Sequence, residues 1–166
     1  GLSEIDWEWL IADPEIIYIG TWTGPRGNLQ RVGRTLNLAK GKIFNTSYRA
    51  TGTGERKDLE GVQNQPETIP ALEGYNASKQ FYTYGFDWYP ERIRWWMIHP
   101  QTADTIVLWD YQGSQLGIPQ NHTHYRLNFW HTNNWPVEGN PASIEKPLDR
   151  YELEIDWMSY KPWKKK

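Results

Sequence analysis

Cysteine is absent from this 166-residue chain, which excludes disulfide bonds and thiolate chemistry and leaves the redox compartment open. No apolar run approaches the ~20 residues that a helix needs to cross a bilayer, so we expect no membrane partner. An excess of one charge is also missing, because 18 Lys and Arg stand against 20 Asp and Glu. That balance makes nucleic acid a poor candidate for a partner.

A helical apolar period is missing as well, since no stretch of ten or more residues repeats every 3.6 positions. β-Branched and aromatic runs between Gly- and Pro-containing turns instead predict strands almost throughout. We expect strands at residues 4–8, 15–23, 30–38, 43–49, 81–88, 93–98, 105–110, 125–130 and 151–160.

Residues 50–78 are predicted to be a long loop, with short structure around residues 69–72, because polar residues, Gly and Pro dominate there. The fold class predicted is all-β, a two-sheet β-sandwich. Residues 1–160 are expected to form one domain, and the Lys-rich residues 161–166 a solvated basic tail.

Aromatic residues are plentiful, and Trp and Tyr are far commoner than Phe, with 11 Trp and 10 Tyr against 4 Phe. Trp and Tyr offer an apolar face and a polar edge, which suits a groove for a hydroxyl-rich ligand. An aromatic β core is the plainer explanation, and the two explanations are compatible.

The first ten residues contain three carboxylates in strict alternation, Glu4, Asp6 and Glu8. Alternate residues of a strand share a face, which leaves Ile5 and Trp7 on the other face, together with Trp9. Like charges this close push pKa values apart, so one carboxyl can stay protonated while another ionises. Hydrolysis of a glycosidic bond needs such a pair.

Two plainer interpretations of the triplet remain open, a solvent-facing strand or part of a calcium site built from oxygens. The Cα atoms of Glu4 and Glu8 lie about 13 Å apart on an extended strand. On a twisted sheet the two side chains can lean toward each other. The distance between their carboxyl groups can then be either the ~5–5.5 Å of retaining glycosidases or the ~6.5–9.5 Å of inverting ones. Spacing alone therefore does not choose the stereochemistry.

Four segments, in order along the chain, resemble glycoside hydrolase family 16, in the form of its licheninases and related transglycosylases. The first is Glu4-Ile5-Asp6-Trp7-Glu8-Trp9-Leu10, which looks like the catalytic strand of that family. The second is the hairpin of residues 81–96, the third Asn128-Phe129-Trp130 and the fourth residues 155–160. The resemblance implies a β-jelly roll whose concave sheet forms an open glycan cleft.

By this resemblance, Glu4 is the nucleophile that forms a glycosyl ester and Glu8 is the acid and then the base. Asp6 orients the neighbouring carboxylates. The implied function is a retaining endo-β-glucanase that hydrolyses β-1,3 or mixed β-1,3-1,4 glucan by double displacement. A transglycosylase with the same site, and a carbohydrate-binding or structural jelly roll without turnover, are the alternatives. A secreted or extracellular location is expected.

Aromatic and polar residues beside the acids and in later strands are the expected sugar contacts. They are Trp9, Trp22, Asn128, Trp130, His131 and Trp135. No cofactor is expected for catalysis, and the resemblance suggests a structural calcium ion with Asp156 as a ligand. Gly20 stands where licheninases carry a cleft Asn, so that contact with the sugar is expected to be missing.

The family places its catalytic strand near the middle of the jelly roll, whereas only three residues precede Glu4 here. We therefore expect either that a second polypeptide supplies the missing amino-terminal strands or that the chain is a processed or split product, because a half-sandwich exposes strand edges and apolar faces. Poor folding of the isolated chain is the corresponding expectation.

Overall fold

The computed structural model describes residues 1–112, 117–129 and 150–163. These residues contain eight strands, in two antiparallel sheets, and one short 3₁₀ helix. The prediction of an all-β, two-sheet sandwich is confirmed. By its contacts the chain divides into two units, Gly1–His124 and Tyr125–Lys166, and every named strand belongs to the first.

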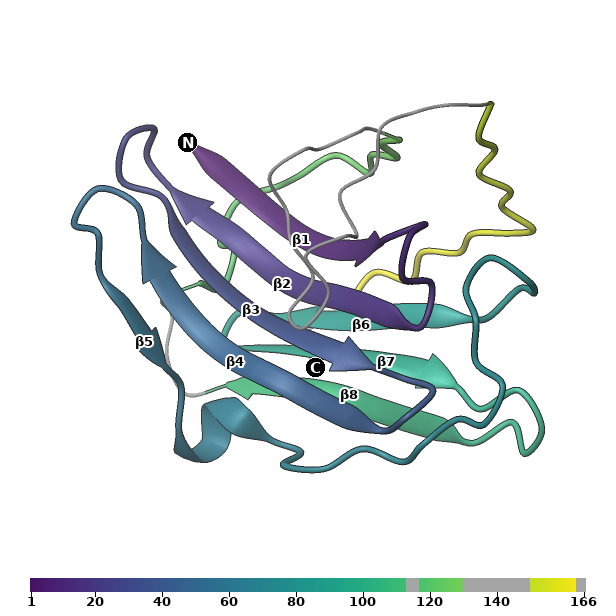
Figure 1. Ribbon diagram of the computed structural model, residues 1–166. Coiled ribbons are helices and arrows are strands. Elements are labelled where there is room, and N and C mark those ends of the chain that lie inside the picture. The colour runs from purple at the N-terminus through teal and green to yellow at the C-terminus, as the bar shows by residue number, and fades with distance from the viewer. Residues whose placement is uncertain (113–116, 130–149, 164–166) are drawn as a thin grey trace. The chain divides into compact units, whose positions relative to one another are not determined.

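The larger sheet is a meander in which each strand pairs with the next along the chain (Figure 1). Gly24 and Gly27 in the turn between its second and third strands have φ values of 104° and 90°, which residues with a Cβ rarely adopt. The strands are β1 (Leu2–Trp9), β2 (Ile16–Gly24), β3 (Gln30–Asn37), β4 (Lys42–Ala50) and β5 (Arg56–Asp58).

Strand β1 lies at one edge of this sheet, since among the described strands it pairs with β2 alone. The second polypeptide expected from the sequence stays a prediction.

The smaller sheet consists of β6 (Tyr84–Tyr89), β7 (Arg92–Ile98) and β8 (Thr105–Gln112). Buried and half-buried residues alternate along strand β7, as expected for a sheet with one covered face. Its apolar residues, Ile93, Trp95 and Met97, are fully buried. Arg94 on the other face binds Asp87 of β6 at 2.5 Å.

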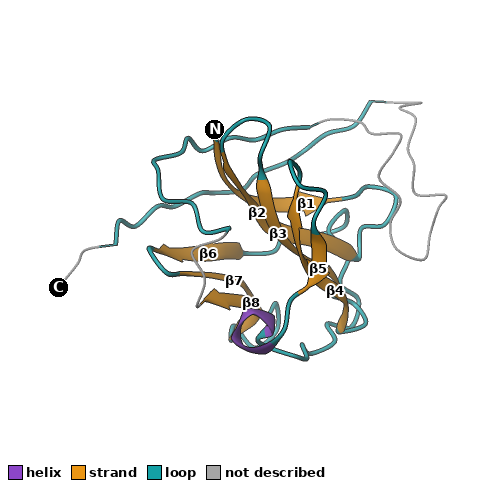
Figure 2. Cartoon of the chain, turned by 90° about the vertical axis from the view of Figure 1, so that its left-hand side faces the viewer, coloured by secondary structure: helices purple, strands orange, loops and turns teal. Residues whose placement is uncertain are grey.

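The two sheets form two layers with the hydrophobic core between them (Figure 2). Ile17, Ile19 and Val32 of the larger sheet belong to this core, together with the stacked rings of Trp95 and Trp109, whose centroids lie 5.0 Å apart. The Trp95 indole also donates a hydrogen bond to the backbone oxygen of Asp6 at 3.3 Å. The core therefore fixes the strand that carries the three acids.

Residues 50–78 contain more structure than the sequence suggested. Strand β5 and the 3₁₀ helix η1 (Gly61–Asn64) lie within them, so the expected short structure occurs earlier than residues 69–72. Ile69, Leu72 and Tyr75 are buried in the core. Isolated apolar residues in a polar segment give no periodic signal, although each anchors the chain to the sandwich.

The strands expected at residues 125–130 and 151–160 are not observed in the described part of the second unit, residues 125–129 and 150–163. Most of their alternating apolar residues are exposed, including Leu127 at 53% and Trp157 at 59%, whereas Tyr151 is half-buried. Alternation in a sequence shows which residues would share a face, but a strand also needs a hydrogen-bonded partner. Within this unit the rings of Phe129 and Tyr151 lie 6.3 Å apart.

Candidate functional site

Glu4, Asp6 and Glu8 all lie on β1 and are half-buried on one face of the larger sheet. Ile5 and Trp7, which alternate with them, pack against the core. The three acids therefore lie on the sheet face turned away from the core, which we call the site face. This arrangement is the one predicted from the E-x-D-x-E pattern.

The strand register extends each acid into a row of side chains across the site face. Glu4 begins the first row, Asp6 the second and Glu8 the third. The rows are Glu4–Trp22–Arg31–Arg49–Arg56, Asp6–Gly20–Gly33–Ser47–Asp58 and Glu8–Tyr18–Thr35–Asn45.

The middle row has no side chains at its second and third positions. A Cβ on Gly20 would lie 2.4 Å from the backbone oxygen of Val32, so β3 approaches β2 too closely for any larger residue. Gly33 is paired with Gly20 on β3. Next to Asp6 the middle row therefore has no side chains on β2 and β3. Gly20, Gly33 and the neighbouring Tyr18 are buried, whereas Trp22 is half-buried.

The Arg31 side chain bends over the middle row. Its guanidinium atoms lie 3.1–3.3 Å from the position that a Cβ on Gly33 would occupy. Its guanidinium carbon is also 5.6 Å from the centre of the Trp22 ring, within the range of a cation–π contact. The cation therefore lies beside the aromatic residue that is paired with Glu4.

The acids perturb one another in the way that the sequence suggested. Burial, followed by the charges of Glu4 and Glu8 and a hydrogen bond with Glu4, raises the pKa of Asp6 to about 8. Burial also raises the pKa of Glu8 to about 7, and Glu4 adds to that shift. The positive charge of Arg31 opposes both shifts.

Glu8 also has an unsatisfied atom. Its Oε2 is buried and has no hydrogen-bond partner among the described residues. A buried, unpaired carboxyl oxygen costs about 1–3 kcal/mol, so its position calls for a functional or structural reason. With a pKa near 7, this carboxyl can hold a proton at neutral pH.

The predicted sugar contacts are only partly brought together. Trp22 lies in the same row as Glu4, on the site face. Trp9 lies on the opposite face, stacked on Trp7 with ring centroids 5.9 Å apart and edge-on to Tyr84 at 5.1 Å. The structure does not bring Trp9 to the acids.

The remaining predicted residues lie beyond the first unit. Asn128 and Asp156 are exposed residues of the second unit. Trp130, His131 and Trp135 lie outside the described residues. In residues 1–112, 117–129 and 150–163, no group of three or more His, Cys, Asp or Glu could hold a metal ion. The calcium ion expected with Asp156 as a ligand stays a prediction.

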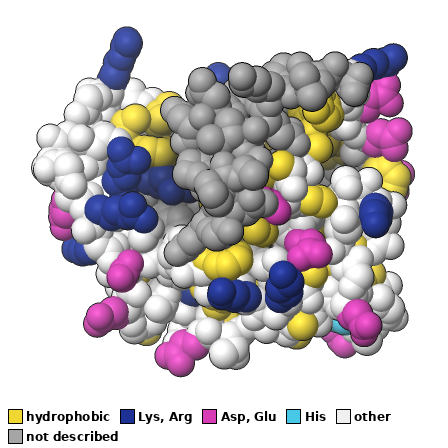
Figure 3. All heavy atoms as spheres, in the orientation of Figure 1, with side chains coloured by type: hydrophobic (Ala, Val, Ile, Leu, Met, Phe, Trp, Pro, Cys, Tyr) yellow, Lys and Arg dark blue, Asp and Glu magenta, His cyan; other side chains and the backbone are white. Residues whose placement is uncertain are grey.

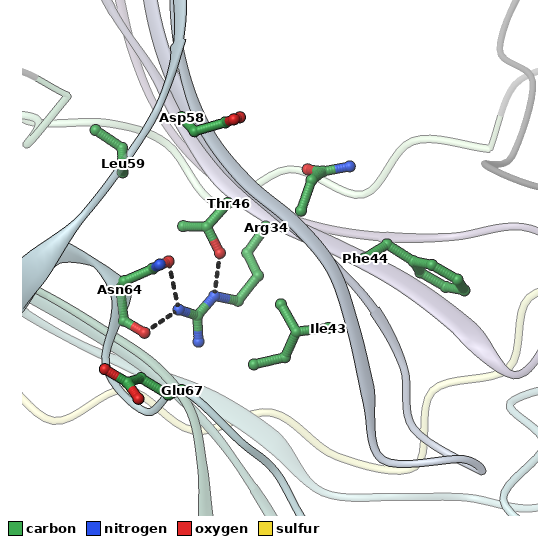
Figure 4. Close-up of a pocket in the computed structure, with 9 residues that line it drawn as sticks. Arg34, Ile43, Phe44, Thr46, Asp58, Leu59, Asn64 and Glu67 are labelled. Carbon is green, nitrogen blue, oxygen red and sulfur yellow. Dashed lines mark hydrogen bonds between the residues drawn. The ribbon is translucent and has the colours of Figure 1, made fainter.

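A hollow of about 330 Å³ lies away from the three acids, around Arg34, whose side chain points to the core face of β3 (Figure 4). Arg34 is 1% exposed and donates to Thr46 Oγ1 at 2.8 Å and to the carbonyl oxygens of Pro66 and Leu108 at 2.9 Å. Two further bonds reach the carbonyl and side-chain oxygens of Asn64, at 2.5 and 3.2 Å. Since all five N–H groups of a guanidinium are then used, this hollow is a structural junction.

Arg31 and Gly33 are the site residues that sequence reasoning missed. The predicted strand at residues 30–38 already placed both on one face, but the face was not matched to that of the acids. That match depends on the register between β1, β2 and β3, which the sequence does not state.

A scan against models of known protein families, a search of curated proteins and a search of solved structures each found no match to this chain. Among the described residues, no helix has the length and apolar character needed to cross a bilayer.

Proposed function

We propose that this chain is a retaining endo-hydrolase of a β-linked polysaccharide, with β-1,3 or mixed β-1,3-1,4 glucan as the first substrates to test. The observation that carries the proposal is the set of three half-buried acids on the site face, with Trp22 in the row of Glu4. The half-buried ring of Trp22 suits the apolar face of a sugar ring, and the acids supply the chemistry.

In the first half of the reaction, a Glu4 oxygen attacks the anomeric carbon and the glycosidic C–O bond breaks. Glu8 gives its proton to the departing oxygen, and the sugar is left as an ester of Glu4. The raised pKa of Glu8 supports this role, because a general acid must still be protonated near neutral pH.

In the second half, Glu8 is a carboxylate and takes a proton from water, whose oxygen attacks the anomeric carbon and releases Glu4. Two inversions give net retention. Asp6 holds its proton near neutral pH and shares a hydrogen bond with Glu4, so it orients the nucleophile and limits the negative charge in the row. A sugar hydroxyl in place of water would make the same site a transglycosylase.

The test replaces Glu4 and Glu8 separately by Gln and measures the reducing sugar released from β-1,3 and mixed-linkage glucans. Each substitution should lower kcat/KM at least about 10²–10⁴-fold, because each removes a group that acts in the transition state. Glu91→Gln is the matched control, since Glu91 is an exposed carboxylate outside the three rows and should leave the rate unchanged.

Binding separates catalysis from simple carbohydrate recognition. Both Gln variants should retain oligosaccharide binding within about threefold in calorimetry, since the shape of the side chain is kept. Binding of a glycan with no release of sugar by the wild-type protein would instead favour the non-catalytic jelly roll.

A further inference from the structure

Three arginines lie next to one another on the site face. Arg31 of β3, Arg49 of β4 and Arg56 of β5 are directly opposite in the strand register, in the row that begins with Glu4. Arg49 and Arg56 are exposed and Arg31 is half-buried. Figure 3, in the orientation of Figure 1, shows Lys and Arg side chains gathered over the part of the sheet where β3–β5 lie.

This row is unfavourable for the fold by itself. Like charges directly opposite on neighbouring strands destabilise a sheet. Within residues 1–112, 117–129 and 150–163, none of the three arginines forms an ion pair with a carboxylate. The arginines of the smaller sheet differ, since Arg92 and Arg94 are both paired with aspartates.

The spacing of the row suits a ligand that runs across the strands. Strands lie about 4.8 Å apart, which places the backbones at Arg31, Arg49 and Arg56 about 10, 14 and 19 Å from that at Glu4. A polysaccharide that reacts at the acids and continues over Trp22 would pass over all three. Guanidinium groups bind carboxylate and sulfate oxygens through two parallel N–H bonds.

We propose that the arginine row forms subsites for an anionic polysaccharide, one that carries sulfate or carboxylate groups on sugars to one side of the bond that is cut. This inference rests on the proposed function for the position of the reacting sugar. It adds the substrate class, which the acids alone do not specify. The anionic groups lie over Arg49 and Arg56, because Glu4, Asp6 and Glu8 would repel them at the other end of the row.

Nucleic acid fits the row less well. It carries a phosphate at every nucleotide, so a strand long enough to pass over the arginines would also place phosphates against the three acids. A polysaccharide can remain neutral at the acids and charged further along.

The experiment measures binding by affinity electrophoresis and calorimetry at low salt, with three probes that share one backbone: laminarin, sulfated laminarin and carboxymethylated laminarin. Arg49→Gln/Arg56→Gln is compared with the wild type. We expect the double variant to bind at least one charged probe about tenfold more weakly, because two charge-assisted contacts are lost. Binding of neutral laminarin should change less than about twofold.

The matched control is Lys40→Gln/Lys79→Gln, which removes two exposed positive charges that lie outside the row. It should leave all three affinities within about twofold. The sulfated and carboxymethylated probes decide between the two anionic groups. Equal weakening by both double variants would overturn the proposal, because it would show a general charge effect, as would tighter binding of a DNA oligonucleotide than of either charged glycan.

The binding readout separates this inference from the proposed function. Release of sugar from laminarin by both the wild type and the arginine variant, without preferential binding of a charged probe, would leave the hydrolase standing and remove the anionic subsites. Preferential binding of a charged probe that depends on Arg49 and Arg56, without cleavage of any probe, would support the anionic subsites and remove the hydrolase.

Discussion

Two arginines on β3, three residues apart, lie on opposite faces of the same sheet. Arg34 faces the core and uses all five N–H groups on neighbouring oxygens. Arg31 faces outward over Gly33 and Trp22, within electrostatic range of Asp6 and Glu8. The comparison indicates that Arg34 stabilises the fold, whereas Arg31 belongs to the candidate site. On the core face the polar groups around Arg34 satisfy one another, although the buried Trp7 Nε1 has no partner among the described residues. On the site face, Glu8 Oε2 and the arginines of the Glu4 row lack a hydrogen-bond or ion-pair partner in the same part of the chain.

The largest difference between the two faces should appear in stability. Arg34→Met leaves buried oxygens of Thr46, Asn64 and Leu108 without a donor, and we expect it to lower the free energy of unfolding by about 3 kcal/mol or more. Arg31→Met should change it by less than ~1 kcal/mol, because Arg31 is half-buried and donates no hydrogen bond to the described residues. Urea unfolding of both variants measures the two values. Equal losses would mean that Arg31 is also a structural residue.

A smaller effect should appear in the pH dependence of stability. The pKa values of Asp6 and Glu8 are raised to about 8 and 7, so the folded chain keeps protons that the unfolded chain loses above about pH 4. Their contribution to stability is therefore complete below pH 4 and is lost as the pH rises to about 8. Asp6→Asn should match the wild type near pH 4 and exceed it by about 1–3 kcal/mol at pH 8.5.

Urea unfolding across this pH range measures the difference, with Asp104→Asn as the control for an exposed aspartate outside the site. A constant offset between Asp6→Asn and the wild type at every pH would show that Asp6 has an ordinary pKa in the folded protein.

The smallest expected effect concerns the arginine row. Removing two like charges from neighbouring strands should raise stability, so Arg49→Gln/Arg56→Gln should gain about 0.2–1 kcal/mol at low salt. The gain should shrink in 0.5 M salt, where exposed charges are screened. Thermal or urea unfolding at the two salt concentrations measures it. A loss of stability would indicate that the arginines are paired in the folded protein and would remove the main reason to seek an anionic ligand.

Particular residues show what could be predicted from the sequence. The face shared by Glu4, Asp6 and Glu8 followed from alternation, and the turn at residues 24–27 followed from its Gly and Pro. Seven of the eight strands of the first unit were located to within a few residues, because their β-branched and aromatic runs are continuous. Strand β5, which lies in the predicted loop of residues 50–78, was missed.

Other features depend on contacts between distant segments, which local patterns do not encode. The row from Glu4 to Arg56 exists only because four strand pairings hold a fixed register. The anchoring of Ile69 and Leu72 depends on an opposing core surface. Residues 125–129 show the opposite failure, since they alternate as a strand would but pair with no described strand.

The central claim is that the three acids cleave a β-linked glycan with retention of configuration at the anomeric carbon. Proton NMR of the anomeric signals during the first minutes of hydrolysis by the wild-type protein tests it most directly. The β-anomer of the new reducing end should appear first, and the α-anomer should follow only by mutarotation. If the α-anomer appears first, or if no neutral or anionic β-glycan is cut, the double displacement through Glu4 and Glu8 is wrong.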